Sequence, residues 1–248
     1  MKRLAAIILA ILFLPVVASA AWVATDDFEA YSVATIVGQT GGSGWSGNWA
    51  LGSGSSADYT IVSSPAIGTR AASIKATAGF VEHTLSSTQT TGSVYFLTRR
   101  NSTSAANGAR IRMPAAGGAV EYDVGFYGTD IILFANSGQK VVCSGLSADT
   151  WYEVQVEYDT TVPQHRARCR PQLGSWGAFT SQWEPNGGTT AGAITAFGLQ
   201  ALGSDASITY FDRISDTEES TSAAVRASSA LKVFGGFVHI NVGGLVIR

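Results

Sequence analysis

Four tryptophans in polar, glycine-rich stretches are the residues of this sequence best suited to hold a ligand. Trp45 and Trp49 lie in one such loop, and Trp176 and Trp183 lie in another. An exposed indole offers an apolar face on which a sugar ring can stack, and polar neighbours fix the orientation of the sugar. The alternative is that these rings cap one end of a hydrophobic core. All four are candidate carbohydrate-binding residues.

The chain has two cysteines, Cys143 and Cys169. An even pair favours a disulfide in an exported chain, and the N-terminal segment described below predicts export. We expect a bridge that ties together the two neighbours of the strand between them; the alternative is two free, buried thiols. Zinc is not expected, because a structural site needs four ligands and the only histidines are His83, His165 and His239.

Other reactive motifs are missing from the sequence. The glycine-rich stretch 38–49 lacks phosphate-loop spacing and a following Lys-Ser/Thr pair, so no nucleotide site is expected. No Gly-x-Ser-x-Gly nucleophile elbow occurs in a strand–helix context. We expect His83 at the surface or in a hydrogen-bonded position, and His165 on the outer face of its strand.

The clearest structural element is the segment Trp151–Asp159. Its apolar residues Tyr152, Val154, Val156 and Tyr158 alternate with Trp151, Glu153, Gln155 and Glu157. This period of two predicts a half-buried antiparallel strand whose polar face lies toward solvent. The run 164–170 also alternates, and the two segments are predicted to form a hairpin.

Other short strand candidates recur at regular spacing, separated by glycine-rich turns, and no sustained helical period follows the N-terminal segment. This pattern predicts an all-β, two-sheet antiparallel sandwich. The candidates span residues 58–62, 72–76, 80–85, 93–99, 109–113, 119–127, 130–135, 140–143, 193–201 and 206–214.

Residues 1–20 have the three parts of a secretory signal peptide: a basic start, the apolar run Leu4 to Ala18, and the small-residue site Ala18-Ser19-Ala20. We expect cleavage after Ala20 and a secreted, extracellular or periplasmic protein. The apolar run is short of the ~20 residues of a spanning helix, and no membrane span is expected after cleavage. The remaining chain has 14 basic and 18 acidic residues, a balance that excludes an electrostatic footprint for nucleic acid.

The C-terminal part differs in composition from the rest. Residues 217–229 are small and polar and are predicted to form a linker. Residues 230–248 contain three short apolar runs separated by Gly-Gly pairs, which predict a small β-meander. Such a meander is marginal alone, so it could serve self-assembly with another chain.

Several motifs together resemble the concanavalin A-like lectin/glucanase superfamily, of the laminin-G-like kind. They are Asp27-Phe28-Glu29-x-Tyr31 leading to Gly44-Trp45-Ser46-Gly47-x-Trp49, the run Gly92 to Arg99, the run Thr150 to Asp159, and Tyr210 to Ser215. The resemblance covers about Trp22 to Asp216 and implies a jelly-roll domain over residues 21–216.

The resemblance also implies where catalysis would lie. Enzymes of the superfamily carry a pattern similar to Glu-x-Asp-x-x-Glu, whose carboxylates flank the glycosidic bond. Glu121 and Asp123 match its first part, but Phe126 stands at the last position; Glu153–Glu157 has Gln155 in place of the Asp. We therefore do not expect an enzyme.

Some relatives bind calcium at the rim of the sandwich, so Ca²⁺ is a possible cofactor here. The oxygen ligands would come from Asp26, Asp27, Asp205 and Asp212. For Asp212 the alternative is a hydrogen bond to a nearby turn.

The sequence favours a secreted, non-catalytic carbohydrate-binding or adhesion module whose partner is a glycan or a cell-surface polysaccharide. The alternative is a structural subunit of an extracellular assembly that pairs through residues 230–248. A glycoside hydrolase is less favoured.

Overall fold

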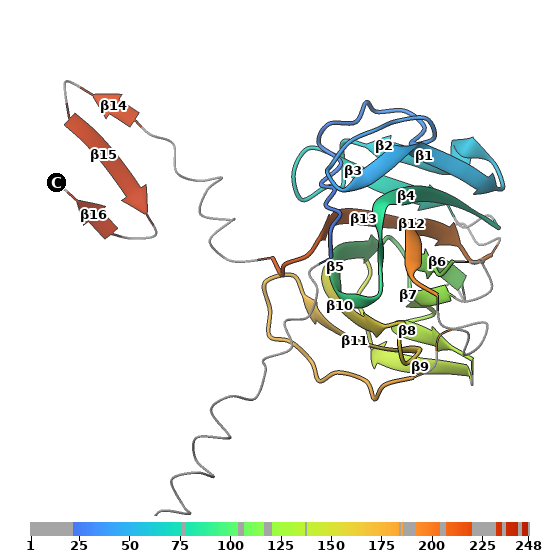
Figure 1. The fold of residues 1–248 in the computed structure, drawn as a ribbon. Coiled ribbons are helices and arrows are strands. Elements are labelled where there is room, and N and C mark those ends of the chain that lie inside the picture. Colours follow the sequence, from blue (N-terminus) through green and yellow to red (C-terminus); the bar gives the residue numbers. More distant parts are fainter. Residues whose placement is uncertain are drawn as a thin grey trace, which may run out of the picture.

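The computed structural model describes residues 22–75, 78–103, 107–116, 121–136, 138–183, 185, 192–203, 207–219, 232–234, 237–242 and 245–247. These residues form an all-β jelly-roll sandwich of two antiparallel sheets and a third, small sheet (Figure 1). The predicted fold class is therefore confirmed. The predicted signal peptide, residues 1–20, lies outside the described residues.

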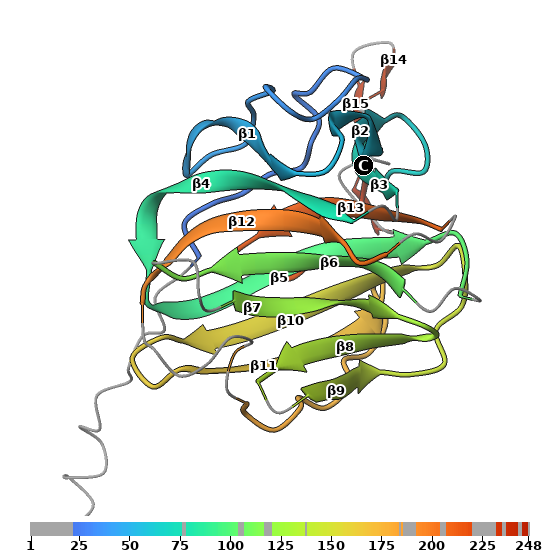
Figure 2. The same cartoon turned by 90° about the vertical axis from the view of Figure 1, so that its right-hand side faces the viewer.

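One layer of the sandwich is a seven-stranded sheet, which faces the reader in Figure 2. Each pair of neighbouring strands in it is antiparallel. In spatial order the strands are β1 (Trp45–Ser53), β4 (Gly79–Gln89), β12 (Ile194–Ala201), β6 (Asn107–Pro114), β7 (Glu121–Tyr127), β8 (Asp130–Ala135) and β9 (Gly138–Cys143).

The other layer is a six-stranded sheet. Its strands in spatial order are β11 (Gln164–Pro171), β10 (Trp151–Asp159), β5 (Thr91–Arg100), β13 (Ile208–Ser215), β3 (Ala71–Lys75) and β2 (Tyr59–Val62), with a short 3-10 turn η1 (Ser56–Asp58) before β2. β10 and β11 pair without a break from Tyr152↔Pro171 to Asp159↔Gln164. The predicted hairpin is confirmed.

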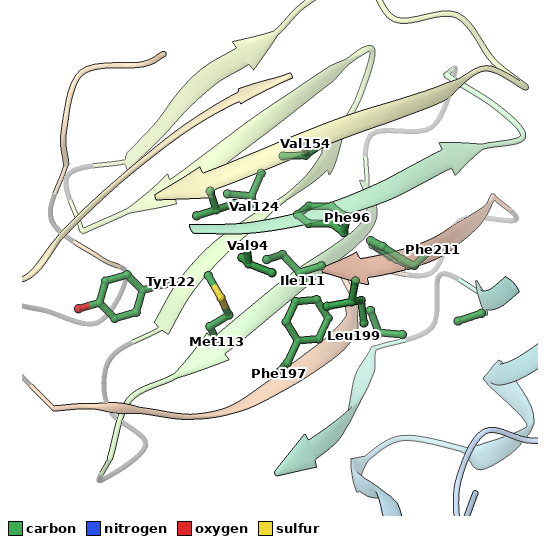
Figure 3. Packing of buried hydrophobic residues seen from close by; sticks show 14 of the residues in the cluster. Val94, Phe96, Ile111, Met113, Tyr122, Val124, Val154, Phe197, Leu199 and Phe211 are labelled. Atoms are coloured by element: carbon green, nitrogen blue, oxygen red, sulfur yellow. The ribbon is translucent and has the colours of Figure 1, made fainter. Parts of the chain in front are cut away.

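The core fills the space between the two sheets. Alternate residues of each strand point inward because side chains on a strand repeat every two residues, and each large apolar side chain buried there contributes about 1.5–3 kcal/mol. Figure 3 shows the labelled part of this cluster, with residues from both layers: Val94, Phe96, Val154 and Phe211 from the six-stranded sheet, and Ile111, Met113, Tyr122, Val124, Phe197 and Leu199 from the seven-stranded sheet.

The two cysteines form the predicted disulfide, with their Cα atoms 6.1 Å apart. Its position differs from the expectation, since Cys143 lies on β9 in one sheet and Cys169 on β11 in the other. Both are end strands of their sheets. The bridge therefore joins the two layers along one side of the sandwich instead of tying together two neighbours of β10.

The C-terminal meander is also present as expected. β14 (Lys232–Phe234), β15 (Phe237–Val242) and β16 (Leu245–Ile247) pair in sequence as an antiparallel sheet. In the part of the chain that the structure describes, these strands pair only with one another. No helix among the described residues is long and apolar enough to cross a membrane.

Candidate functional site

Trp45 and Trp49 pack against the core. Trp49 is 1% exposed, and its indole N–H donates to the Tyr31 hydroxyl at 3.0 Å. Burial of its ring corrects the expectation that Trp49 offers a face to a ligand. Trp45 is half-buried and stacks on His83 with ring centroids 4.7 Å apart. His83 is buried, with Nε2 3.0 Å from the Gly47 carbonyl oxygen, which agrees with the expected hydrogen-bonded position.

Trp176 belongs to a stack of alternating cationic and aromatic groups on the outer face of β11, called here the arginine ladder. The Phe179 ring lies 4.4 and 4.5 Å from the guanidinium carbons of Arg166 and Arg168, and the Trp176 ring lies 4.5 and 4.4 Å from those of Arg168 and Arg170. Residues two apart on a strand are separated by roughly 7 Å, so each ring lies between two arginines. Two guanidinium groups therefore pack on the half-buried Trp176 ring, which gives this indole a structural contact that needs no ligand.

The same arginines bind the neighbouring strand. Their guanidinium nitrogens lie 2.6 Å from Glu157, 2.7 Å from Gln155 and 2.6 Å from Glu153. Gln155 is 4% exposed and Glu153 is 1% exposed. The expectation that the polar face of β10 lies toward solvent is wrong for these two residues, because the arginine ladder covers them. Burial raises the pKa of Glu153 above its usual value.

Trp183 ends a segment that runs along the free edge of β11. The N–H groups of Gly177, Thr180 and Trp183 donate to carbonyls of that strand at 2.9–3.1 Å. The Lys140 ammonium lies 3.7 Å from the centroid of the Trp183 ring. One face of this indole is thus covered by a cation.

His165 faces the interior, which makes the expected outward position wrong. It is 1% exposed, lies 5.4 Å from the Tyr122 ring, and has Nδ1 3.1 Å from the Trp183 carbonyl oxygen. Burial lowers the pKa of His165 to about 4. The ring therefore packs as a neutral core residue.

The first partial match to the glycosidase pattern, Glu121 and Asp123 of β7, lies in a charged network on the outer face of the seven-stranded sheet. Asp123 is fully buried and lies 2.9 Å from Arg110. Arg112 pairs with Glu121 and, at 3.4 Å, with Glu82. The two matching carboxylates are thus held by arginines.

Gly198 of β12 makes this network possible. It lies in register with Glu82 on one side and Arg112 on the other. A Cβ there would lie 2.8 Å from Cγ of Arg112 and 2.9 Å from Cγ of Glu82. Only the missing side chain lets the two charged groups meet across the strand between them.

A cavity lies at the outer face of the six-stranded sheet, and we call it the acidic cavity. Its volume is about 550 Å³. Three apolar residues, Phe96, Leu97 and Ile214, line it, together with the hydroxyl-bearing residues Thr25, Ser43, Ser215 and Thr217. Six acidic residues also line it, against one basic residue, Arg213: Asp26, Asp27, Glu29, Glu153, Glu218 and Glu219.

Asp26 is the most buried of the acidic residues that the N-terminal segment contributes to the cavity. It is 2% exposed, and its carboxylate accepts the Phe28 N–H at 2.8 Å and the Tyr31 hydroxyl. Burial raises the pKa of Asp26 to about 6, against the opposing effect of these hydrogen bonds. Asp27, next to it, is exposed. The N-terminal segment therefore contributes one buried and one exposed aspartate to the lining of the cavity.

The calcium candidates that the structure describes, Asp26, Asp27 and Asp212, do not form a metal-binding group. Asp212 is 1% exposed, and its carboxylate accepts hydrogen bonds from the N–H groups of Ile67 and Arg213, each at 2.8 Å. This agrees with the alternative stated for Asp212, a hydrogen bond to the backbone in place of a metal ion. Asp205 lies outside the described residues. Among those that are described, no three His, Cys, Asp or Glu side chains form a group that could hold a metal ion.

The chain was compared with known proteins. No protein-family model and no curated protein matches it. Solved structures match at low identity. One is titled "Sialidase" (11% identity, TM-score 0.46, 70% of this chain and 17% of that one). Another is titled "Cell entry of botulinum neurotoxin type C is dependent upon interaction with two ganglioside molecules" (10%, 0.49, 82% and 49%).

A third is the catalytic domain of a glycoside hydrolase family 131 protein from Coprinopsis cinerea (16%, 0.43, 71% and 85%). The chain spans half or less of the first two matched chains. With TM-scores below 0.5, these likenesses assign neither a family nor a ligand.

Proposed function

We propose that the protein is an exported carbohydrate-binding or adhesion module and that the acidic cavity receives a sugar. The observation that carries this proposal is the lining of the cavity. Acidic and hydroxyl-bearing residues line a cavity of about 550 Å³ together with Phe96, Leu97 and Ile214. Carboxylates accept hydrogen bonds from sugar hydroxyls, and pockets of 300–1,000 Å³ with apolar walls and few polar anchors are typical ligand sites.

Export and the nature of the partner belong to the same proposal. The N-terminal segment and the disulfide support an oxidising, extracellular or periplasmic location. The partner we propose is a glycan or a cell-surface polysaccharide. The jelly-roll fold supports the resemblance to the concanavalin A-like superfamily, and calcium enters as a condition of the binding test.

We propose a non-catalytic role. A glycosidase places one carboxyl group as acid and a second as nucleophile or base at the scissile bond. Here Glu121 pairs with Arg112, Asp123 pairs with Arg110, and Glu153 pairs with Arg170. These ion pairs engage the candidate carboxylates, which favours a structural role for them.

The alternative function is a structural subunit that assembles through the C-terminal strands. The supporting observation is the small sheet itself, whose outer strands β14 and β16 pair on one side only within the described residues. Unpaired strand edges recruit strands from another chain. Sugar binding and assembly are compatible in one protein.

The test is a glycan panel screened with the mature chain, residues 21–248, in calcium and in chelator. We expect at least one member to bind, and Asp27→Asn to weaken it roughly 10-fold or more, because a hydrogen bond to a charged group contributes about 1.5–3 kcal/mol. The matched control is Asp149→Asn, which removes an exposed carboxylate paired with Arg99. A panel without binders, or a D27N variant that binds as well as the parent, contradicts the proposal.

A further inference from the structure

The segment Thr217–Glu219, called here the C-terminal clamp, follows β13 and belongs to the predicted linker. It nevertheless contacts the outer face of the six-stranded sheet. Glu219 is the centre of these contacts, and its side chain is 9% exposed. The chain is therefore held on the sandwich as far as Glu219, four residues beyond the end of β13 at Ser215.

All four polar groups of Glu219 have partners. Its N–H donates to Glu153, and its carbonyl accepts from Arg170 at 2.8 Å. Its two carboxylate oxygens accept from Arg213 at 2.7 Å and from Gln172 at 2.8 Å. Three of these partners are charged, and hydrogen bonds to ionised groups are the strong ones.

Glu218 adds a contact to the arginine ladder. Its carboxylate accepts the indole N–H of Trp176 at 2.7 Å and lies 3.8 Å from Arg170. The ladder thus gives the clamp a rigid base, since Trp176 is itself fixed between Arg168 and Arg170. This role accounts for Trp176 without a ligand.

The clamp is also part of the acidic cavity. Thr217, Glu218 and Glu219 line it together with four residues of the N-terminal segment: Thr25, Asp26, Asp27 and Glu29. Glu153 belongs to both structures, because it lines the cavity and accepts the Glu219 N–H. Release of the clamp would remove a wall and leave a buried carboxylate with one partner fewer, which is costly.

We propose that Glu219 is a positioning residue that anchors the C-terminal clamp as a wall of the acidic cavity, so that the cavity is complete only while the clamp is held on the sheet. The anchoring itself is independent of the ligand; its consequence for sugars rests on the proposed function. A ligand that contacts both the clamp and the N-terminal segment stabilises the closed clamp. A partner of residues 230–248 whose binding releases the clamp weakens ligand binding, and the ligand weakens the binding of that partner by the same factor.

The first experiment measures amide hydrogen exchange in the full mature chain without ligand. In the Glu218→Ala/Glu219→Ala variant we expect exchange at residues 217–219 to become at least 10-fold faster, while the core strand β6 stays protected. The matched control, Glu157→Ala, breaks the Arg166 pair at the other end of the arginine ladder and should leave residues 217–219 unchanged. Equal exchange in parent and double variant overturns the anchoring.

Should the double variant lose protection in β6 as well, Gln172→Ala replaces it, because this change removes one contact of the clamp only. We then expect a smaller acceleration, about 3-fold, at the same amides. No acceleration in this variant overturns the anchoring.

The second experiment uses cellotetraose, laminaritetraose and chitotetraose as probes. A probe that binds the parent should slow exchange at residues 217–219 and bind the double variant at least 10-fold more weakly. Unchanged affinity with an open clamp overturns the coupling and leaves the proposed function standing. Absence of binding by these probes and by the wider panel contradicts the proposed function, and the exchange comparison alone then decides the anchoring.

Discussion

At the scale of single residues, two buried aspartates set the response of the fold to pH. Burial raises the pKa of Asp26 to about 6 and that of Asp212 to about 7, although backbone N–H groups donate to both. A carboxyl group whose pKa is higher in the folded state binds its proton more tightly there. Its contribution to stability is complete below its unfolded pKa and is lost as the pH rises through the folded value.

We therefore expect protonation of these two aspartates to raise the free energy of unfolding as the pH falls from about 7 toward 4, against the opposite effect of the buried His165, and Asp212→Asn to remove the Asp212 part of this rise. The asparagine keeps an acceptor oxygen for the Ile67 N–H but carries no charge. Urea unfolding at pH 5 and pH 8 measures the difference, with the surface change Asp149→Asn as control. A D212N variant with the full pH dependence of the parent would refute the assignment.

At the scale of elements, the disulfide acts between sheets. It joins β9 to β11, the end strands of the two layers, across 26 residues of sequence that include β10. Elsewhere the layers are joined by packing of side chains in the core and by hydrogen bonds such as that from Arg100 of β5 to the Gly128 carbonyl between β7 and β8, at 3.1 Å. The bridge thus restricts separation of the two sheets at their end strands, each of which has a neighbouring strand of its sheet on one side only.

Replacing both cysteines by serine should lower the free energy of unfolding by about 3–4 kcal/mol, from the closed loop of this length in the unfolded chain. The urea midpoint of C143S/C169S gives the value, and the parent protein in reductant provides the control. A midpoint equal to that of the oxidised parent would mean that the bridge contributes nothing.

At the scale of the whole molecule, the sandwich and the C-terminal sheet differ in how the backbone hydrogen-bonding groups at their strand edges are paired. The sandwich pairs its strands in two layers and covers β11 with the segment 177–183. The C-terminal sheet has three short strands, and an isolated sheet of this size is marginal in water.

We expect the mature chain to self-associate and a chain ending at Glu219, which keeps the clamp, to remain monomeric. Light scattering and negative-stain microscopy of both proteins at equal concentration test this. Two monomeric proteins would remove support for assembly through residues 230–248.

The sequence by itself determined the elements that depend on local pattern. Strict alternation located β10 and β11, because a strand exposes alternate residues to different environments. The Gly-Gly pairs separated the three strands of the C-terminal meander, and the even cysteine count in a chain predicted to be exported indicated the bridge. Each of these signals lies within a few residues of the element that it predicts, or in a count.

Only the tertiary structure decided which groups line the candidate site. Trp49 and Trp176 have the same local signature, yet one is buried in the core and the other lies between two arginines. The acidic cavity brings residues 25–27 and Glu29 together with residues 217–219, although nearly the whole domain separates them in sequence. Sheet order and register bring such residues together, and these are set by packing between distant strands, so no local pattern could assign the site.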